Sequence, residues 1–222
     1  MTIAPLDTVD CLRLAVRICW RITDLRNSLS APGWLVSQHV IEGAWIVFVS
    51  YWLISAFGRE KARRREPPAE RLLHVLWLAG AFYLLDYSEP WFGALIRRFV
   101  PDWLWLAELG AALTVAGIAF AIWARHHLGK NWSAEVTIRA DHKLIRTGPY
   151  ARLRHPIYTG LILALIGTVL SVGEYRALVA LGIFLIGWTR KAKKEEAFLA
   201  QEFGAAFEEH KRLTGFFLPR LG

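Results

Sequence analysis

One step in the sequence combines residue types suited to ligand binding, namely Arg154-His155-Pro156 with Tyr158 two residues on. Because proline suits the first position of a helix and keeps the preceding residue out of helical geometry, we predict a helix that begins at Pro156 with His155 as its N-cap. The first turn of a helix leaves backbone N–H groups unsatisfied and carries the positive end of the dipole. Such an end binds carboxylates or phosphates, and Arg154 would reinforce it. The alternative is that Arg154 only reaches toward lipid headgroups and His155 only caps the helix.

A second charged segment follows the last apolar run and reads Arg190-Lys191-Ala192-Lys193-Lys194-Glu195-Glu196. Residues four apart share one face of a helix, and here that face would hold Lys191, Glu195, Leu199, Phe203 and Phe207. We therefore expect an amphipathic helix that emerges from the membrane. A Lys-to-Glu pair at this spacing is most often a surface ion pair, so the pair alone does not indicate a site.

Other site chemistries lack their sequence motifs. Adjacent His126 and His127 cannot share one helix face as a metal pair, and Cys11 and Cys19 offer neither a disulfide framework nor a cysteine-ligated zinc site. The sequence has no Gly-rich dinucleotide fingerprint and no phosphate-binding Walker loop. No metal site is predicted, and a nucleotide-like ligand would have to be held by other means.

The composition indicates a membrane protein. Of 222 residues, 55% are hydrophobic, 11 are Trp, and the mean hydropathy is +0.30, which excludes a disordered or low-complexity chain. The net charge of +8 could suggest nucleic acid, but the basic residues fall between long apolar runs. That arrangement favours a lipid bilayer as partner, and no nucleic-acid binding is predicted.

The chain is predicted to be an all-α integral membrane protein with about five transmembrane helices. The apolar runs are Leu35–Phe57, about Leu72–Tyr87, Trp103–Ala124, Pro156–Val172 and Tyr175–Thr189. The first exceeds the roughly 20 residues needed to cross a bilayer, whereas the last two are short. Because only Gly173 and Glu174 separate these two, we expect a tight helical hairpin. His39 and Glu42 lie inside the first run, where ionisable residues indicate either function or pairing with each other or another helix.

The positions of the basic residues indicate the orientation. The segments 58–71, 125–155 and 190–222 together hold 20 of the 27 Lys and Arg residues. Since basic loops stay on the cytoplasmic side, the C terminus and the polar segments should face the cytoplasm and the N terminus the outside. Near the start, Arg13, Arg17 and Arg21 recur among apolar residues, which predicts an amphipathic helix at the membrane interface. The pattern does not say on which side of the membrane this helix lies. No signal peptide is expected.

Several tryptophans lie near the ends of the predicted spans, where indole rings favour the headgroup region. We predict a membrane-anchoring belt made of Trp34, Trp91, Trp103, Trp105, Trp123 and Trp188. The chain then divides into an interfacial segment (1–34), three transmembrane helices (35–124) and a region with a cytoplasmic loop, the hairpin and a C-terminal helix (125–222).

From about Arg125 to the C terminus, the sequence resembles the isoprenylcysteine carboxyl methyltransferases and the related phospholipid N-methyltransferases. The motifs that carry the resemblance are Asp141–Ile145 with Gly148-Pro149-Tyr150, then Arg154-His155-Pro156-x-Tyr158-x-Gly160, then Glu195-Glu196 followed by Phe203-Gly204 and Pro219. The resemblance implies an integral-membrane enzyme that binds S-adenosyl-L-methionine between the cytoplasmic loop and the C-terminal helix.

On this basis, the residues assigned to the cofactor are Glu135, His142, Lys143, Leu144, Ile145, Tyr150, Arg154, His155, Pro156, Ile157, Tyr158, Glu195 and Glu196. Relatives have glutamine where this chain has Glu135, and often tyrosine where it has Phe207 and His210. Gly160 should let another group approach the backbone closely.

The arginine that orients the substrate in this family falls on Lys191, with Arg190 adjacent, and we predict these two as the catalytic residues. A carboxylate acceptor needs a cationic clamp and no general base, whereas an amine acceptor must lose a proton, and Glu135 would then matter more. We predict methylation of a carboxylate on a lipid-like or prenylcysteine-type substrate. The alternatives are a phospholipid or other N- or S-methyltransferase, an NADPH-dependent double-bond reductase, and a non-catalytic membrane scaffold or lipid-binding protein.

Overall fold

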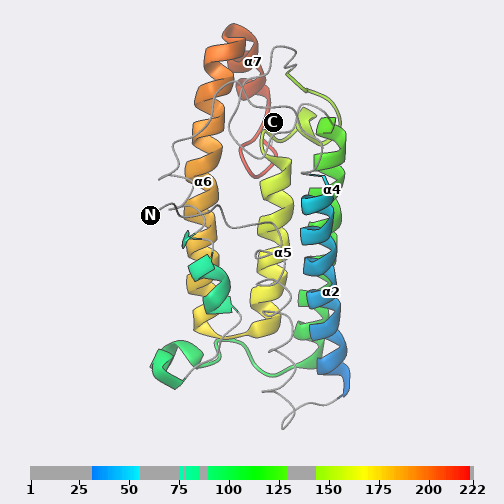
Figure 1. The fold of residues 1–222 in the computed structure, drawn as a ribbon, viewed down its shortest axis with the longest axis vertical. Coiled ribbons are helices and arrows are strands. Elements are labelled where there is room, and N and C mark those ends of the chain that lie inside the picture. The colour runs from blue at the N-terminus through cyan, green and yellow to red at the C-terminus, as the bar shows by residue number, and fades with distance from the viewer. Residues whose placement is uncertain (1–31, 56–75, 78, 86–89, 130–143, 221–222) are drawn as a thin grey trace, which may run out of the picture.

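The computed structural model describes residues 32–55, 76–77, 79–85, 90–129 and 144–220, and these parts of the chain are helical with short connections. The α-helices are α2 (Pro32–Ile54), α4 (Leu104–Leu128), α5 (Pro156–Val172), α6 (Tyr175–Phe203) and α7 (Ala205–Leu213). Two 3₁₀ helices, η1 (Pro90–Ile96) and η3 (Gly148–Ala151), lie between them. In Figure 1, α2, α4, α5 and α6 run lengthwise through the molecule, and α7 lies beyond the end of α6. The prediction of an all-α fold is confirmed for these residues.

Among the described residues, α4 is long and apolar enough to cross a membrane, and α5 is a shorter apolar helix. The first predicted run forms α2, which begins three residues earlier than expected. Residues 76–77 and 79–85 of the second run are helical. The N-terminal segment with Arg13, Arg17 and Arg21 lies outside the described residues.

The α5 helix begins and ends as predicted, because both ends carry clear sequence signals. Pro156 takes its first position, and Gly173 ends it with φ 69°, a left-handed backbone that favours glycine. The α4 helix begins after Trp103 and runs past the predicted end at Ala124. Its last turn holds Arg125, His126 and His127, whose positive charge suits the C-terminal end of a helix dipole.

The last predicted span and the charged segment after it form one element. Helix α6 runs unbroken for 29 residues, from Tyr175 through the expected boundary at Thr189. The Lys, Glu and Ala residues beyond Thr189 are good helix formers, so the helix continues where its hydrophobicity stops. It ends at Gly204, whose φ of 50° suits glycine. The prediction that Phe207 extends the face of Phe203 is therefore wrong, because Phe207 lies on α7.

Glycines allow α4 and α5 to touch through their backbones. A Cβ atom added at Gly117 would lie 2.4 Å from the Ala164 nitrogen, and one at Gly167 would lie 2.4 Å from the Gly110 oxygen. Gly160 belongs to the same seam, since its added Cβ would lie 2.6 Å from the Gly117 oxygen. Small residues at a helix interface let two backbones approach in this way. The expected close approach at Gly160 is therefore made by α4.

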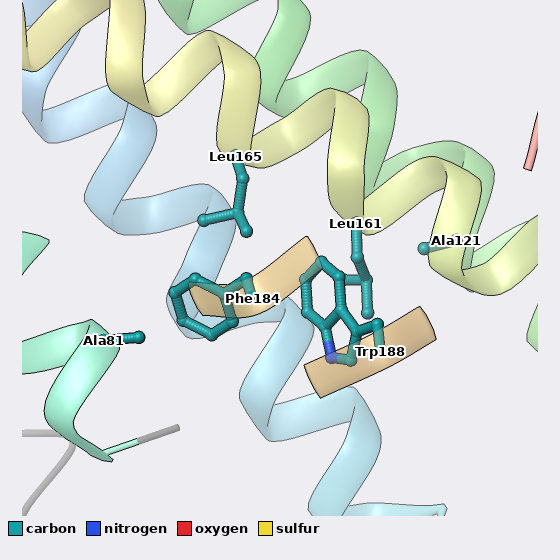
Figure 2. Packing of buried hydrophobic residues seen from close by; sticks show 6 residues of the cluster. All are labelled: Ala81, Ala121, Leu161, Leu165, Phe184 and Trp188. Atoms are coloured by element: carbon teal, nitrogen blue, oxygen red, sulfur yellow. The ribbon is translucent and has the colours of Figure 1, made fainter. Parts of the chain in front are cut away.

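Aromatic rings fill the space between α2, the helical residues 79–85 and α6. Trp45 of α2 donates to the Thr168 hydroxyl at 3.1 Å, and its ring lies edge-on to Phe82, which contacts Phe184 in turn. Figure 2 shows the core cluster that continues this packing, formed by Ala81, Ala121, Leu161, Leu165, Phe184 and Trp188. His39 is exposed and contacts the Leu35 carbonyl of its own helix at 2.6 Å.

The predicted tryptophan belt needs one correction. The side chains of Trp91, Trp103, Trp105 and Trp123 are 50 to 70% exposed, as residues at a membrane interface would be. Trp188 is only 7% exposed and belongs to the core cluster. Its position near the end of an apolar run was misleading, because α6 continues and carries Trp188 inside the fold.

The turn between α5 and α6, at the opposite end of α6 from α7, is held by a buried arginine and its partners. Arg176 is 1% exposed, and its Nε donates to Glu174. Its Nη1 donates to the carbonyls of Leu84 and Leu85 at 2.6 Å, which ties the end of the preceding helical segment to this turn. These bonds satisfy the buried guanidinium and set where α6 begins.

Filling the seam between α4 and α5 should destabilise the protein. Gly167→Leu places atoms where the Gly110 backbone lies, and overpacking of this kind costs about 1–3 kcal/mol. The matched control is Gly43→Ala in α2, where an added Cβ meets nothing within 4 Å. Thermal unfolding in detergent measures the effect. An unchanged midpoint for Gly167→Leu would contradict the direct contact of the two backbones.

Candidate functional site

The first turn of α5 meets the acidic pair of α6. The Tyr158 hydroxyl donates to Glu195 Oε1 at 2.8 Å, and Arg154 Nε donates to Glu196 Oε1 at 2.6 Å. His155 lies between them, with Nε2 3.2 Å from Glu196 Oε1 and Nδ1 3.7 Å from Glu195 Oε2. Residues some 40 positions apart in sequence thus form one cluster. The family resemblance assigned both the first turn of α5 and the acidic pair of α6 to one cofactor site, and the structure brings these two segments into contact.

His155 occupies the N-cap position of α5, but its side chain does not cap the helix. The residue is 6% exposed, and its ring faces the two glutamates and the rings of Phe216 and Tyr158. The imidazole is therefore part of the interhelical cluster, and the alternative that it only caps the helix is wrong.

The two glutamates differ in what holds them. The Glu196 side chain is 13% exposed and accepts bonds from Arg154 and His155. Burial raises the pKa of Glu196, but the hydrogen bonds from His155 and Arg154 and the charge of Arg154 outweigh burial, so its pKa lies below the ordinary value. The Glu195 side chain is 30% exposed. Glu196 is thus bound within the protein, whereas Glu195 keeps surface available to a ligand.

Arg154 forms its hydrogen bonds with other groups of the protein. Besides Glu196, its guanidinium donates to the carbonyls of Lys211 and Thr214, at the end of α7. Its side chain is 12% exposed. These bonds account for the buried charge of Arg154 without a ligand. The assignment of Arg154 and Glu196 to the cofactor stays a prediction.

The turn η3 packs against the end of α4, shortly before the start of α5 in the sequence. Tyr150 is buried and stacks on His127 of α4, with ring centroids 6.4 Å apart. His127 contacts the Thr147 hydroxyl at 2.9 Å, which ties the end of α4 to this turn. Burial, and next the negative charge of Glu195, raise the pKa of Tyr150, so its hydroxyl keeps its proton.

Aromatic residues form the apolar side of the site. The Tyr158 ring stacks on Trp188, with centroids 6.1 Å apart, and Trp188 contacts Phe184. Trp188 and Glu195 are seven residues apart, so they lie on the same face of α6, and Lys191 lies between them. Lys191 is half-buried, whereas Arg190 is exposed.

Some assigned residues are close to this cluster and others are not described. Pro156 and Ile157 belong to the first turn of α5, and Leu144 and Ile145 are half-buried before η3. Glu135, His142 and Lys143 lie outside the described residues. Residues of the cluster that sequence reasoning missed are His127, Trp188, Phe216 and Phe217.

Comparison with known proteins agrees with this arrangement. Residues 110–201 match the sequence model of the isoprenylcysteine carboxyl methyltransferase (ICMT) family. The resemblance to the ICMT family is confirmed. The matched segment includes α5 and both glutamates of the acidic pair.

Curated relatives are similar over part of their length. The chain is 27% identical to a probable protein-S-isoprenylcysteine O-methyltransferase of Oryza sativa, over 64% of this chain and 74% of that protein. It is 32% identical to the protein-S-isoprenylcysteine O-methyltransferase of Saccharomyces cerevisiae, over 50% of this chain and 48% of that protein. It is also 29% identical to the cobalt-zinc-cadmium resistance protein CzcN of Cupriavidus metallidurans, over 54% of each. The chain thus spans about half the length of the last two.

A solved structure shares the fold. The eukaryotic intramembrane Ras methyltransferase ICMT superposes with a TM-score of 0.57 at 19% identity, and the similarity covers 98% of this chain and 87% of that one. At this identity the likeness shows the fold alone.

Phe207 and His210, the two positions at which the resemblance implied tyrosine in relatives, are 1% and 5% exposed on α7. Burial, and next the positive charges of Arg146 and Arg154, lower the pKa of His210. Both side chains therefore pack α7 onto the rest of the site.

Removing the charge of Glu196 should destabilise the protein more than removing that of Glu195. Glu196→Gln leaves Arg154 without its carboxylate in a largely buried position, at a cost of roughly 2–4 kcal/mol. Glu195→Gln, the matched control, loses one charge-assisted bond in a more exposed position, about 1 kcal/mol. Thermal or denaturant unfolding of both variants measures the difference. Equal losses would show that the two carboxylates are held alike.

Stability should also fall at acid pH because of Glu196. Since its folded-state pKa lies below the ordinary value, the stabilisation is present above the ordinary pKa and is lost as the pH falls through the lowered value. Unfolding midpoints measured from about pH 6 to pH 3 should fall for the wild type. The fall should be smaller for Glu196→Gln, and parallel curves would contradict the role of this carboxylate.

Proposed function

We propose that the chain is a membrane-embedded methyltransferase that uses S-adenosyl-L-methionine and methylates a carboxylate of a lipid-like or prenylcysteine-type substrate. The observation that carries the proposal is the contact of Tyr158 and His155 with Glu195 and Glu196, inside the segment that matches the ICMT family. The names of the rice and yeast relatives support the same reaction.

The residues of the cluster suit this cofactor chemically. The cofactor carries an ammonium, a sulfonium and ribose hydroxyls, and the partly exposed carboxylate of Glu195 can accept bonds from such donors. The stacked rings of Tyr158 and Trp188 suit a cation near their faces. When bound, S-adenosyl-L-methionine supplies an electrophilic methyl group. The work of the protein is to hold the acceptor in line with that group and to exclude water.

Lys191 is the better candidate for the acceptor clamp. It lies one turn before Glu195, on the face of α6 that carries Trp188, whereas Arg190 is exposed. A carboxylate acceptor is already a nucleophile, so a nearby cation suffices and no base is needed. Lysine supplies a point charge and lacks the bidentate geometry of arginine. We therefore infer that Lys191 attracts the acceptor and that shape or other groups fix its orientation.

The basic residues support an active site that faces the cytoplasm. The cluster joins α5 and α6 near segments 125–155 and 190–222, which are rich in Lys and Arg. Five membrane spans and an interfacial segment over residues 1–34 remain part of this proposal. The lipid part of the acceptor would enter from the bilayer, beside the apolar helices.

Cofactor binding tests the proposal directly. Calorimetry of the detergent-solubilised protein should detect binding of S-adenosylhomocysteine and none of NADPH. His155→Ala and Glu195→Ala should weaken that binding by about tenfold or more, as expected for loss of a charge-assisted contact. Lys193→Ala, an exposed position on α6, is the control. Binding of NADPH alone would indicate a reductase, and binding of neither ligand would favour a scaffold.

Lys191→Ala should reduce turnover more than cofactor affinity. With labelled cofactor, methyl transfer is measured to a prenylated cysteine carboxylate and to an aminophospholipid. This comparison gives both the turnover and the class of acceptor. We expect a loss of about 10- to 100-fold in kcat/KM for the carboxylate, because an interaction with the acceptor is removed. Arg190→Ala is the matched control. Methylation of the aminophospholipid alone would show that the acceptor is an amine and not a carboxylate.

A further inference from the structure

We propose that residues Thr214–Phe217, which follow α7 and lie beyond the segment that matches the ICMT family, are a positioning segment of the methyl-transfer site. Within it, Phe216 sets the orientation of the His155 ring. The inference rests on the proposed function, because it concerns how that site is built.

The backbone of this segment pairs with the residues just before α5. Leu153 and Gly215 form a parallel bridge, in which the Arg154 N–H donates to the Gly215 carbonyl at 2.9 Å and the Gly215 N–H donates to the Arg152 carbonyl at 3.0 Å. The His155 N–H donates to the Phe216 carbonyl at 3.3 Å. The segment thus accepts bonds from backbone donors at the start of α5.

One side-chain hydroxyl extends this pairing into the helix. Thr159 Oγ1, in the first turn of α5, donates to the Phe217 carbonyl at 2.8 Å. Carbonyl groups of the chain therefore line the end of α5 that the sequence predicted to attract an anion. A ligand carboxylate would meet these oxygens there, so we place the anionic group of the ligand elsewhere.

Two phenylalanine rings hold the His155 imidazole. The Phe216 ring lies edge-on to it, with centroids 4.8 Å apart and an interplanar angle of 66°. The Phe217 ring contacts both His155 and Tyr158 at centroid distances of 6.1 and 6.2 Å. Edge-to-face pairs of this kind have a preferred geometry, so they restrict ring rotation. With Nε2 on Glu196, the imidazole keeps Nδ1 toward Glu195.

The segment is itself anchored. Thr214 is 2% exposed, its hydroxyl donates to the His210 carbonyl at 2.6 Å, and its carbonyl accepts from Arg154. The Arg154 guanidinium also lies over the Phe216 ring, 5.5 Å from its centroid. At Gly215 an added Cβ would lie 1.7 Å from the Leu218 oxygen, so this turn requires glycine. The path of the segment is therefore fixed on both sides of Phe216.

The test compares Phe216→Leu with Phe216→Tyr in the full-length protein. Leucine keeps apolar volume but removes the ring, whereas tyrosine keeps it. We expect S-adenosylhomocysteine to bind about 3- to 10-fold more weakly to Phe216→Leu, the factor that corresponds to loss of an aromatic pair. Phe216→Tyr should bind as the wild type does. Phe99→Leu, which removes a ring contact with Tyr175 away from the site, is the matched control.

A spectroscopic measurement separates positioning from general destabilisation. In spectra of protein with labelled histidine, the His155 ring signals should shift in Phe216→Leu and stay in place in Phe99→Leu. As a second variant, Gly215→Ala should weaken ligand binding, while Gly182→Ala, where an added Cβ meets nothing within 4 Å, should not.

The outcomes distinguish the two proposals. Failure of the wild type to bind S-adenosylhomocysteine would overturn the proposed function and this inference together. Normal binding by the wild type with equal affinity in Phe216→Leu would overturn the positioning role alone. The positioning role would also fall if Phe216→Tyr bound as weakly as Phe216→Leu, or if Phe99→Leu gave the same loss.

Discussion

The ion pair between Arg154 and Glu196 is the interaction on which the site depends. Its two side chains are 12% and 13% exposed, and burying opposite charges is favourable only when further hydrogen bonds satisfy them. His155 bonds to Glu196, and the carbonyls of Lys211 and Thr214 accept from Arg154. One pair therefore joins the start of α5, the C-terminal part of α6 and the end of α7. Glu195 is brought beside Tyr158 as a consequence of this arrangement.

The glycine-mediated contact between α4 and α5 holds α5 in place beneath the Arg154–Glu196 ion pair. Gly110 and Gly117 of α4 touch Gly160, Ala164 and Gly167 of α5 through backbone atoms, which leaves little room for one helix to slide along the other. The stacking of Tyr150 on His127 then attaches η3 to the end of α4. Polar groups at the end of the bundle are thus positioned by apolar contacts along its length.

The sequence allowed some of these features to be predicted, for physical reasons that differ between residues. The limits of α5 were predictable because Pro156 and Gly173 are local signals. The continuation of α6 past Thr189 was not, since hydropathy reports the surroundings of a helix and not where its backbone ends. Gly160, Trp188 and Phe216 have roles that depend on neighbours distant in sequence. The meeting of His155 with the acidic pair was foreseen only through the family resemblance.

Because α6 has no break between Arg176 and Glu196, its two ends move together. The buried guanidinium near its start and the acidic pair lie about 30 Å apart along one rod, given the rise of an α-helix. If α6 crosses a bilayer as proposed, a mismatch between the bilayer and its apolar part, Tyr175–Thr189, would be met by tilt of the whole helix or by local thinning of the bilayer, since the helix has no break near Thr189. Lipid composition would then act on the distance between Glu195 and Tyr158.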